Sequence, residues 1–326
     1  MNSHRAKILV IRGGAIGDFI LTLPAIAALR LQFPQAHLEV LGYPHIVQLA
    51  IAGGVVDHVS SIEARPLAGF FARNGQLAED WAEYFSEFDL IVSYLYDPDE
   101  IFRTNISRCS PAQFIACPHR PGESSQLHAA QVYLKPLERL AIFDADYVPK
   151  LQIGDRENGA LKVEAQSSAG GNLESKATVR LALHPGSGSD RKNWPERRWA
   201  ELVQRLINST SHNLLLAGGE AEGERLQRLA AALPPQRTKV AQSLPLAELA
   251  RLLAKCHGFI GHDSGISHLA AALGLPALVL WGESAERVWR PPAETVKILR
   301  HPAGLERLPV ATVFEQLCRM WPAGPL

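Results

Sequence analysis

The stretch that decides the fold is GFIGHDSGISHLAAALGLPALVLW, residues 258–281. Both of its ends are short apolar runs with the length of a buried strand, and apolar residues recur between them at helical spacing. Those residues are Ile266, Leu269, Ala270 and Leu273. Gly274 and Pro276 then end the helix before the second strand begins. A strand, a helix and another strand in this order predict a parallel sheet.

The same alternation continues on both sides of this stretch. Strand-like runs in the first half of the chain lie at residues 7–11, 38–43, 89–94 and 112–117. Further strand-like runs lie at 179–185, 213–219, 238–242 and 296–300, with helical patterns at 194–207, 224–233 and 245–256. The repeated alternation predicts an α/β protein with two doubly wound, Rossmann-like parallel-sheet domains, whose strand ends face a central cleft.

The boundary between these domains is predicted from composition. Residues 156–178 are small and polar and have no periodicity, which is typical of a linker or loop. We therefore expect an N-terminal domain over 1–155 and a C-terminal domain over 179–326. The last helical pattern, 310–321, follows the last predicted strand, and the sequence does not show which domain it packs against. One expected position is against the first domain.

Composition narrows the class of protein further. The chain has 326 residues, with 33 Lys and Arg balanced by 33 Asp and Glu, so no broad positive surface for nucleic acid is expected. Four cysteines in a chain of this length favour a reducing compartment, and no apolar run reaches the roughly 18 residues that span a bilayer. We expect a cytoplasmic location.

The first strand-to-helix turn is rich in glycine. Gly13, Gly14 and Gly17 follow the strand at 7–11, where a backbone can approach an anion or an acceptor closely. Asp18 comes next, either as a first-turn acid favoured by the helix dipole or as a functional carboxylate. The glycine spacing does not match the G-x-G-x-x-G of nicotinamide-dependent enzymes.

Two turns of the second domain have the composition of a phosphate site. The segment HPGSGSDRKNWP, residues 184–195, offers Ser187, Gly188 and Ser189 as donors and Lys192 as a cation, although a solvated loop explains it as well. The turn at Asp263, Ser264 and Gly265 opens the helix of the deciding stretch, and helix N-termini bind phosphate.

A third turn of the second domain carries a possible ligand-binding acid. The turn LAGGEAEGE, 216–224, places Glu222 at a helix start, either as a ribose-binding acid or as an acid that the helix dipole stabilises.

The sequence offers no clear metal site. The spacing of Cys109, Cys117, His119 and His128 matches no compact zinc motif, and the DPD at 97–99 is typical of a turn. No metal and no cofactor are predicted.

These segments together resemble one known family. KILVIRGGAIGDFILTLPAIAALR (7–30), HPGSGSDRKNWPERRWAEL (184–202), LAGGEAEGE and GHDSGISHLAAALGLP (261–276) resemble glycosyltransferase family 9, the ADP-heptose:lipopolysaccharide heptosyltransferases, in order and spacing. Residues 45–177 contribute little to the likeness. The resemblance implies a GT-B fold in which the first domain binds the acceptor and the second binds the nucleotide-sugar. It also implies an inverting, metal-independent transfer in which ADP-sugar is the donor.

The resemblance also implies roles for individual residues. Asp18 would be the general base, and Lys192 with the loop Ser187–Ser189 would stabilise the departing ADP. The amides of Ser264, Gly265 and Ile266 and the side chain of His268 would contact the same diphosphate. Glu222 would bind ribose, and Asp263 would orient the phosphate loop or the sugar.

The implied partners are a nucleotide-sugar and a lipopolysaccharide core or another lipid-linked glycan, with peripheral contact at the inner membrane. Basic residues of the first domain are available to lipid phosphates: Arg65, Arg73, Arg103 and Arg108. The segment WGESAERVWRPP, 281–292, departs from the family's glycine-rich form, which leaves the sugar open. The alternatives are a GT-B-fold sugar-nucleotide 2-epimerase and a transferase that uses another nucleotide-sugar donor.

Overall fold

The computed structural model describes residues 5–153 and 179–322, so the predicted linker at 156–178 lies outside the described residues. The chain divides into two compact units. The first consists of Met1–Lys150 and Arg287–Trp289, and the second of Leu151–Glu286 and Arg290–Leu326. Each unit contains one parallel sheet, as predicted, while the central cleft stays a prediction.

The first sheet has the strand order β3-β2-β1-β4-β5, and every neighbouring pair is parallel. Its strands are β1 (Lys7–Arg12), β2 (His37–Gly42), β3 (His58–Ser61), β4 (Leu90–Ser93) and β5 (Gln113–Ala116). Its helices are α1 (Ile16–Gln32), α2 (Pro44–Ala52), α3 (Glu79–Ser86), α4 (Ile101–Ser107) and α5 (Ala129–Leu134), with 3₁₀ turns at Arg65–Phe71 and Lys135–Leu140. The order reverses between β1 and β4, which is where doubly wound sheets bind ligands.

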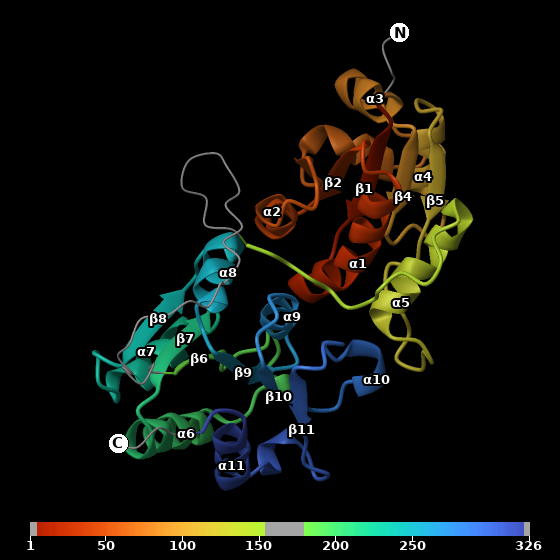
Figure 1. Ribbon diagram of the computed structural model, residues 1–326. Helices are drawn as coiled ribbons and strands as arrows, with labels where there is room; N and C mark the ends of the chain where they lie inside the picture. The colour runs from red at the N-terminus through yellow and green to blue at the C-terminus, as the bar shows by residue number, and fades with distance from the viewer. Residues whose placement is uncertain (1–4, 154–178, 323–326) are drawn as a thin grey trace, which may run out of the picture. The chain divides into compact units, whose positions relative to one another are not determined.

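The apolar composition of β1 explains why it lies in the middle of the first sheet. Five of its six residues are buried, as expected for a strand that is covered on both faces. The helix that follows, α1, is buried on all sides from Phe19 to Ile26 and lies against this sheet (Figure 1). Strand β3 was not predicted, because HVSS is a short polar edge strand without an apolar run.

The second sheet has the order β11-β10-β9-β6-β7-β8 and is also parallel throughout. Its strands are β6 (Arg180–Leu183), β7 (Asn213–Gly218), β8 (Thr238–Gln242), β9 (Gly258–His262), β10 (Ala277–Leu280) and β11 (Val296–Leu299). The helices are α6 (Glu196–Ser209), α7 (Gly223–Ala231), α8 (Leu246–Ala254), α9 (Gly265–Ala272), α10 (Glu286–Trp289) and α11 (Val310–Met320), with 3₁₀ turns at Asp190–Lys192 and Leu305–Arg307. The deciding stretch therefore forms β9, α9 and β10.

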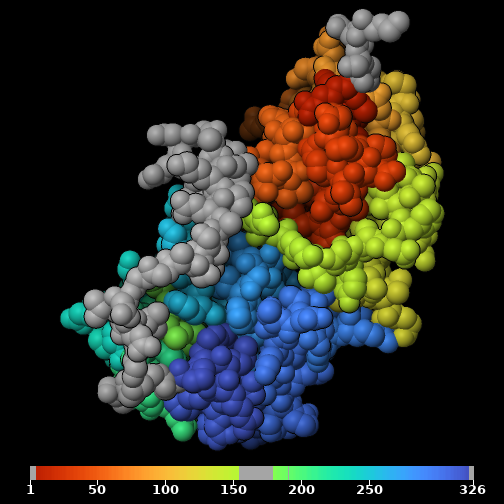
Figure 2. All heavy atoms as spheres, in the orientation of Figure 1, coloured from red at the N-terminus to blue at the C-terminus, as the bar shows by residue number. Residues whose placement is uncertain are grey.

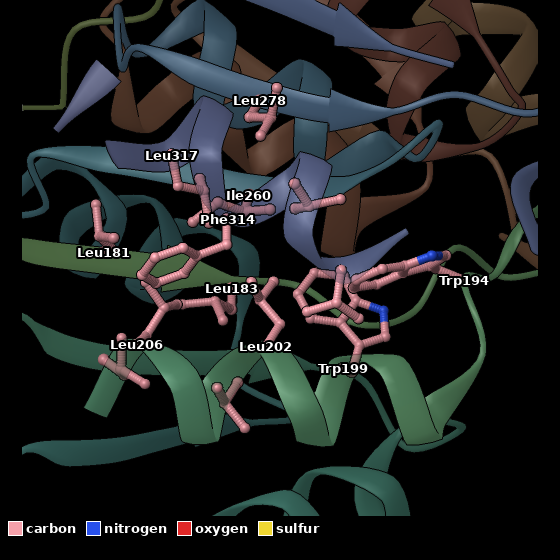
Figure 3. Close-up of a cluster of buried hydrophobic side chains, with 14 of the residues drawn as sticks. Leu181, Leu183, Trp194, Trp199, Leu202, Leu206, Ile260, Leu278, Phe314 and Leu317 are labelled. Carbon is pink, nitrogen blue, oxygen red and sulfur yellow. The ribbon is translucent and has the colours of Figure 1, made fainter. Parts of the chain in front are cut away.

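One apolar core holds this second sheet to its helices. In α6 the buried residues are Trp199, Leu202, Val203, Leu206 and Ile207, the spacing of an amphipathic helix. Figure 3 shows several of them facing strand residues such as Leu183 and Ile260. Trp194 and Trp199 are fully buried, with ring centroids 5.5 Å apart in an edge-to-face arrangement.

The C-terminal helix α11 belongs to this same core. Its buried residues Val313, Phe314 and Leu317 join the core of the second unit, and the guanidinium of Arg205 lies 4.4 Å from the Phe314 ring centre. In Figure 2 the dark-blue residues of α11 lie on the surface of this unit. The helix is held there because its apolar stripe fits α6.

The boundary between the units differs slightly from the predicted one. Arg287–Trp289, expected in the second domain, belong to the first unit. The Trp289 indole donates to Glu123 and lies under the guanidinium of Arg120, 4.7 Å from it. Leu151 in turn joins the second unit, where its amide donates to the carbonyl of Ala272. These contacts join residues that are far apart in sequence, so local composition does not reveal them.

None of the helices in residues 5–153 and 179–322 combines the length and the apolar composition needed to span a bilayer. All four cysteines are free thiols.

Candidate functional site

Asp18 lies in the first turn of α1, directly beyond the carboxyl end of β1. Its side chain accepts a hydrogen bond from the amide of Ala15 at 3.2 Å and remains 25% exposed. An amide at the helix start thus holds one carboxylate oxygen. The carboxylate is both fixed and accessible, which is what a proton acceptor needs.

Arg12, the last residue of β1, lies directly behind Asp18. Its Nη2 is 3.7 Å from Asp18 Oδ1 and donates to the Asp18 carbonyl, while Nη1 donates to the carbonyl of His119 at 2.8 Å. The guanidinium also packs on the ring of Tyr133, 4.6 Å from its centre. Only 3% of Arg12 is exposed, so this charge is buried and Asp18 is the carboxylate that compensates it.

The glycines of this turn have distinct roles. Gly14 has φ +96°, a conformation that L side chains rarely adopt, and a Cβ there would lie 3.1 Å from Asp18 Oδ2. Gly13 and Gly17 are half-buried, and Gly14 is exposed. The exposed backbone at Gly14 therefore lies next to the Asp18 carboxylate, and Gly14 allows this close approach.

In the second unit Lys192 pairs with Asp263. Lys192 Nζ lies 2.5 Å from Asp263 Oδ2, and Ser284 Oγ donates to the same oxygen at 2.6 Å. The lysine side chain is 39% exposed and that of Asp263 only 9%. The ion pair thus has a buried acceptor and an accessible cation at the carboxyl end of β9.

A buried histidine fixes the loop that carries Lys192. His262 Nε2 accepts from the Trp194 amide at 2.9 Å, and its Nδ1 lies 3.2 Å from the Gly186 carbonyl. Since Nε2 accepts, Nδ1 carries the proton and donates. Burial lowers the pKa of His262 to about 3, so the ring stays neutral. It joins β9 to both ends of the loop 184–194.

The loop itself is internally bonded. Ser187 Oγ lies 2.7 Å from Asn193 Oδ1 and 2.8 Å from the Ser189 carbonyl, and the Lys192 amide donates to that same carbonyl. Gly188 has φ +70° and is exposed. Hydrogen bonds within the loop therefore hold it, while Gly188 and Ser189 stay exposed.

The start of α9 lies beside this loop. Ser264 caps the helix by accepting from the Ser267 amide, and Ser267 Oγ donates to the carbonyl of His262. Gly265 and Ile266 form the first turn, where amides lack partners within the helix. His268, one turn further along α9, is only 5% exposed.

Glu222 closes the other side of the loop. It precedes α7, accepts from the Gly219 amide at 2.9 Å and is 8% exposed. A Cβ on Gly186 would collide with Glu222 Cγ, so the missing side chain makes room for this carboxylate. The buried His184 ring is close enough for Glu222 to act on it, but burial dominates and lowers the pKa of His184.

The structure thus collects the predicted residues into two groups. Asp18 and the glycine loop lie in the first unit, and the residues from Ser187 to His268 lie in the second, around the carboxyl ends of β6, β7 and β9. Sequence reasoning missed Arg12, His262 and Ser284. The only signal for Arg12 was a charged residue at the end of an apolar strand, and its partners at 94 and 119 are far away in sequence.

The metal interpretations can be checked over the part of the chain that the structure describes. There, no group of three or more His, Cys, Asp and Glu side chains is arranged to hold a metal ion. In the DPD segment the Glu100 amide donates to the Asp97 carbonyl at 3.1 Å, so the prediction of a turn there is confirmed.

Two doubly wound parallel-sheet units with polar groups at their strand ends define the GT-B class of folds. A solved structure described as E. coli ADP-heptose lps heptosyltransferase II superposes with a TM-score of 0.72 at 18% identity and covers 96% of this chain and 98% of that one. At this identity the likeness shows the fold.

Relatives by sequence are more specific. Lipopolysaccharide heptosyltransferase 1 of Pseudomonas aeruginosa is 42% identical over 91 residues, 28% of this chain and 25% of that protein. The protein of the same name from Escherichia coli is 33% identical over 147 residues, 42% of this chain and 46% of the relative. The matched segments thus span about a quarter and about half of these relatives. The model of glycosyltransferase family 9 (heptosyltransferase) matches residues 128–310, and this chain belongs to that family.

Proposed function

We propose that this protein transfers a heptose from ADP-heptose to a lipopolysaccharide core or a similar glycan, with inversion at the anomeric carbon and without a metal ion. Membership of family 9 supports the reaction class, and the names of two relatives and of a solved structure support the sugar and the acceptor. The observation that carries the mechanism is the fixed, accessible carboxylate of Asp18 at the switch point of the first sheet.

In this mechanism Asp18 removes the proton from the acceptor hydroxyl as the oxygen attacks the anomeric carbon. The bond to ADP breaks on the opposite side, and a single displacement inverts the configuration. The Ala15 amide and the Arg12 guanidinium hold the carboxylate in place, which lowers the cost of orienting it for each turnover.

The residues of the second unit would bind the donor and stabilise the charge on departing ADP. Lys192 supplies a cation, and the loop at 187–189 with the first turn of α9 supplies hydrogen-bond donors. Asp263, to whose carboxylate Ser284 donates, holds the ammonium until the diphosphate competes for it. Glu222 would accept from the ribose hydroxyls, and His268 would contact the diphosphate.

The first test is incubation of the purified protein with ADP-heptose and heptose-free lipopolysaccharide core, followed by mass spectrometry and NMR of the product. We expect addition of one heptose with inverted anomeric configuration, at a rate that a metal chelator does not change. Release of free epimerised sugar, with no glycosylated product, would instead identify a 2-epimerase. Retained configuration would exclude the single displacement.

Variants then test the named residues. Asp18→Asn removes the base while keeping the size of the side chain, and we expect kcat to fall by about 100-fold or more. Asp80→Asn is the matched control, because Asp80 is exposed and its carboxylate, like that of Asp18, accepts a hydrogen bond from a backbone amide, that of Trp81. If Asp18→Asn retains the wild-type kcat, Asp18 is not the base.

Lys192→Ala tests the diphosphate site. We expect both a higher KM for ADP-heptose and a lower kcat, because a cation is lost in the ground state and in the transition state. Lys239→Ala, on the exposed part of β8, is the control.

Thermal unfolding with ADP, UDP, GDP or NAD in excess identifies the nucleotide of the donor, since a ligand bound only by the native state raises stability. Stabilisation by UDP alone would favour another donor.

A lipid-linked acceptor also implies a cytoplasmic location with peripheral contact at the inner membrane. Arg65, Arg73 and Arg108 are exposed on the first unit, and we propose that they contribute to this contact. Cosedimentation with vesicles of anionic phospholipid should be sensitive to salt. Equal binding to neutral vesicles would exclude the electrostatic part of the proposal.

A further inference from the structure

A cavity opens at the same edge of the first sheet as Asp18. Its volume is about 230 Å³, and most of its lining comes from residues 95–98 after β4 and residues 116–119 at the end of β5, together with Glu100 and Arg103. Since β4 lies between β1 and β5, the carboxyl ends of all three strands are adjacent (Figure 1). None of the residues predicted as catalytic or donor-binding lines this cavity.

Arg12 connects this cavity directly to Asp18. One of its terminal nitrogens bonds to the carbonyl of His119, in the cavity wall, and the other faces the Asp18 carboxylate. Neighbouring strands lie about 4.8 Å apart, so roughly 10 Å separate the end of β1 from the end of β5. A glycan with one hydroxyl at Asp18 would therefore place its neighbouring sugar over the cavity.

The most exposed aromatic side chain of this wall is Tyr96. The residue is 71% exposed, and its ring packs edge-to-face on His119, with ring centroids 4.6 Å apart. An exposed aromatic face beside hydrogen-bonding groups suits a sugar, because one face of a pyranose presents C–H groups and its rim presents hydroxyls. Arg103 and Glu100, joined at 2.9 Å on the rim, provide a donor and an acceptor for such hydroxyls.

Hydrogen bonds on both sides of Tyr96 hold the loop that presents it, although Tyr96 itself is exposed. The neighbouring Tyr94 is buried and donates to the carbonyl of Tyr133, and Asp97 accepts from two amides at the start of α4. An exposed ring on a fixed loop loses little conformational freedom when a ligand stacks on it. The Tyr96 ring is therefore held at the surface by its loop and not by being packed into the core.

We propose that this cavity is the acceptor subsite for the sugar next to the attacking hydroxyl, with the Tyr96 ring stacking on that sugar. This rests on the proposed function, whose acceptor is a glycan. Glu100 and Arg103 bind hydroxyls of the same sugar, and Tyr96 selects for a pyranose with an open C–H face.

The test compares acceptor and donor kinetics in Tyr96→Ala. The KM for heptose-free lipopolysaccharide core should rise about tenfold, the upper range for loss of an aromatic contact, while the KM for ADP-heptose stays within about twofold. Tyr96→Phe keeps the ring and should stay close to wild type. Tyr147 also packs on a histidine, His128, but lies outside the cavity, so Tyr147→Ala is the matched control.

An unchanged acceptor KM in Tyr96→Ala would overturn the subsite, and so would an equal rise in Tyr147→Ala. Melting temperatures should match the wild type, because Tyr96 is exposed. If the wild type fails to transfer heptose, the proposed function fails, and the subsite is then tested by binding. Saturation-transfer NMR with the delipidated, heptose-free core oligosaccharide should show contact that Tyr96→Ala loses; no contact with the wild type would also overturn it.

Discussion

Arg12→Met is the perturbation that most sharply tests the arrangement around Asp18. The substitution keeps an unbranched side chain of similar length but removes the buried guanidinium. It deletes hydrogen bonds to the carbonyls of His119 and Asp18 at 2.8 and 3.2 Å and a cation–π contact with Tyr133. It also leaves the Asp18 carboxylate without the cation that faces it.

Removing one partner of a buried ion pair costs about 3–5 kcal/mol. Because Asp18 is 25% exposed and water can solvate it after the change, we expect the lower end of this range, about 3 kcal/mol. For a unit of about 150 residues, this corresponds to a fall in Tm of roughly 6–12 °C. The carboxylate also loses its anchor, so kcat should fall by about tenfold or more, with little change in the KM for ADP-heptose.

The assay combines thermal unfolding with steady-state kinetics. Arg205→Met is the matched control, since Arg205 packs on Phe314 but is exposed, and it should cost less than about 1 kcal/mol. Arg12→Lys should restore part of kcat by returning the charge. A melting temperature and a kcat equal to those of the wild type in Arg12→Met would refute the reasoning, because Arg12 would then not hold Asp18.

Three further predictions concern the second unit. Burial lowers the pKa of His262 to about 3, so the unfolded chain binds a proton that the folded one does not, and stability should fall below pH 6.5 by about 2 kcal/mol at pH 5. Gly186→Ala places a methyl group against the Glu222 side chain, so the KM for ADP-heptose should rise several-fold. Gly258→Ala places one against the Trp321 ring, so Tm should fall without a change in that KM.

Each of these predictions has its own control. His262→Gln removes the titrating ring, and its loss of stability between pH 7 and pH 5, measured by denaturant unfolding, should be smaller than that of the wild type. An equal loss would mean that other groups, such as His184, carry the pH dependence. Gly122→Ala meets only Ser124 Oγ, at 3.9 Å, and should leave both Tm and KM unchanged. If Gly186→Ala and Gly258→Ala also leave Tm and KM unchanged, the neighbouring side chains must move aside and relieve the clashes.

Most of the architecture could be predicted from local pattern. Buried parallel strands are continuous apolar runs, as in KILVIR, and the alternation of such runs with helices specifies two doubly wound sheets. Strand β3 was missed because its residues are polar. The place of α11 was undetermined because its apolar stripe shows that it packs, but not against which partner.

The candidate site divides in the same way. Turn chemistry follows from sequence, because glycines, a first-turn acid and a serine cap act on backbone within a few residues of themselves. This is why the sequence could single out Asp18, Lys192 and the start of α9 as candidates. The residues that hold them were not: Arg12 reaches His119 across 107 positions, and His262 reaches Gly186 across 76.

The sequence by itself thus determined the class of fold, the family and the residue types at each strand end. Only the tertiary structure decided which of these residues meet, which charge is buried and which ring is exposed. The physical reason is that periodicity and turn preference depend on neighbours along the chain. Contacts such as those of Arg12 depend on which strands lie side by side, and the chain sets that only when it folds.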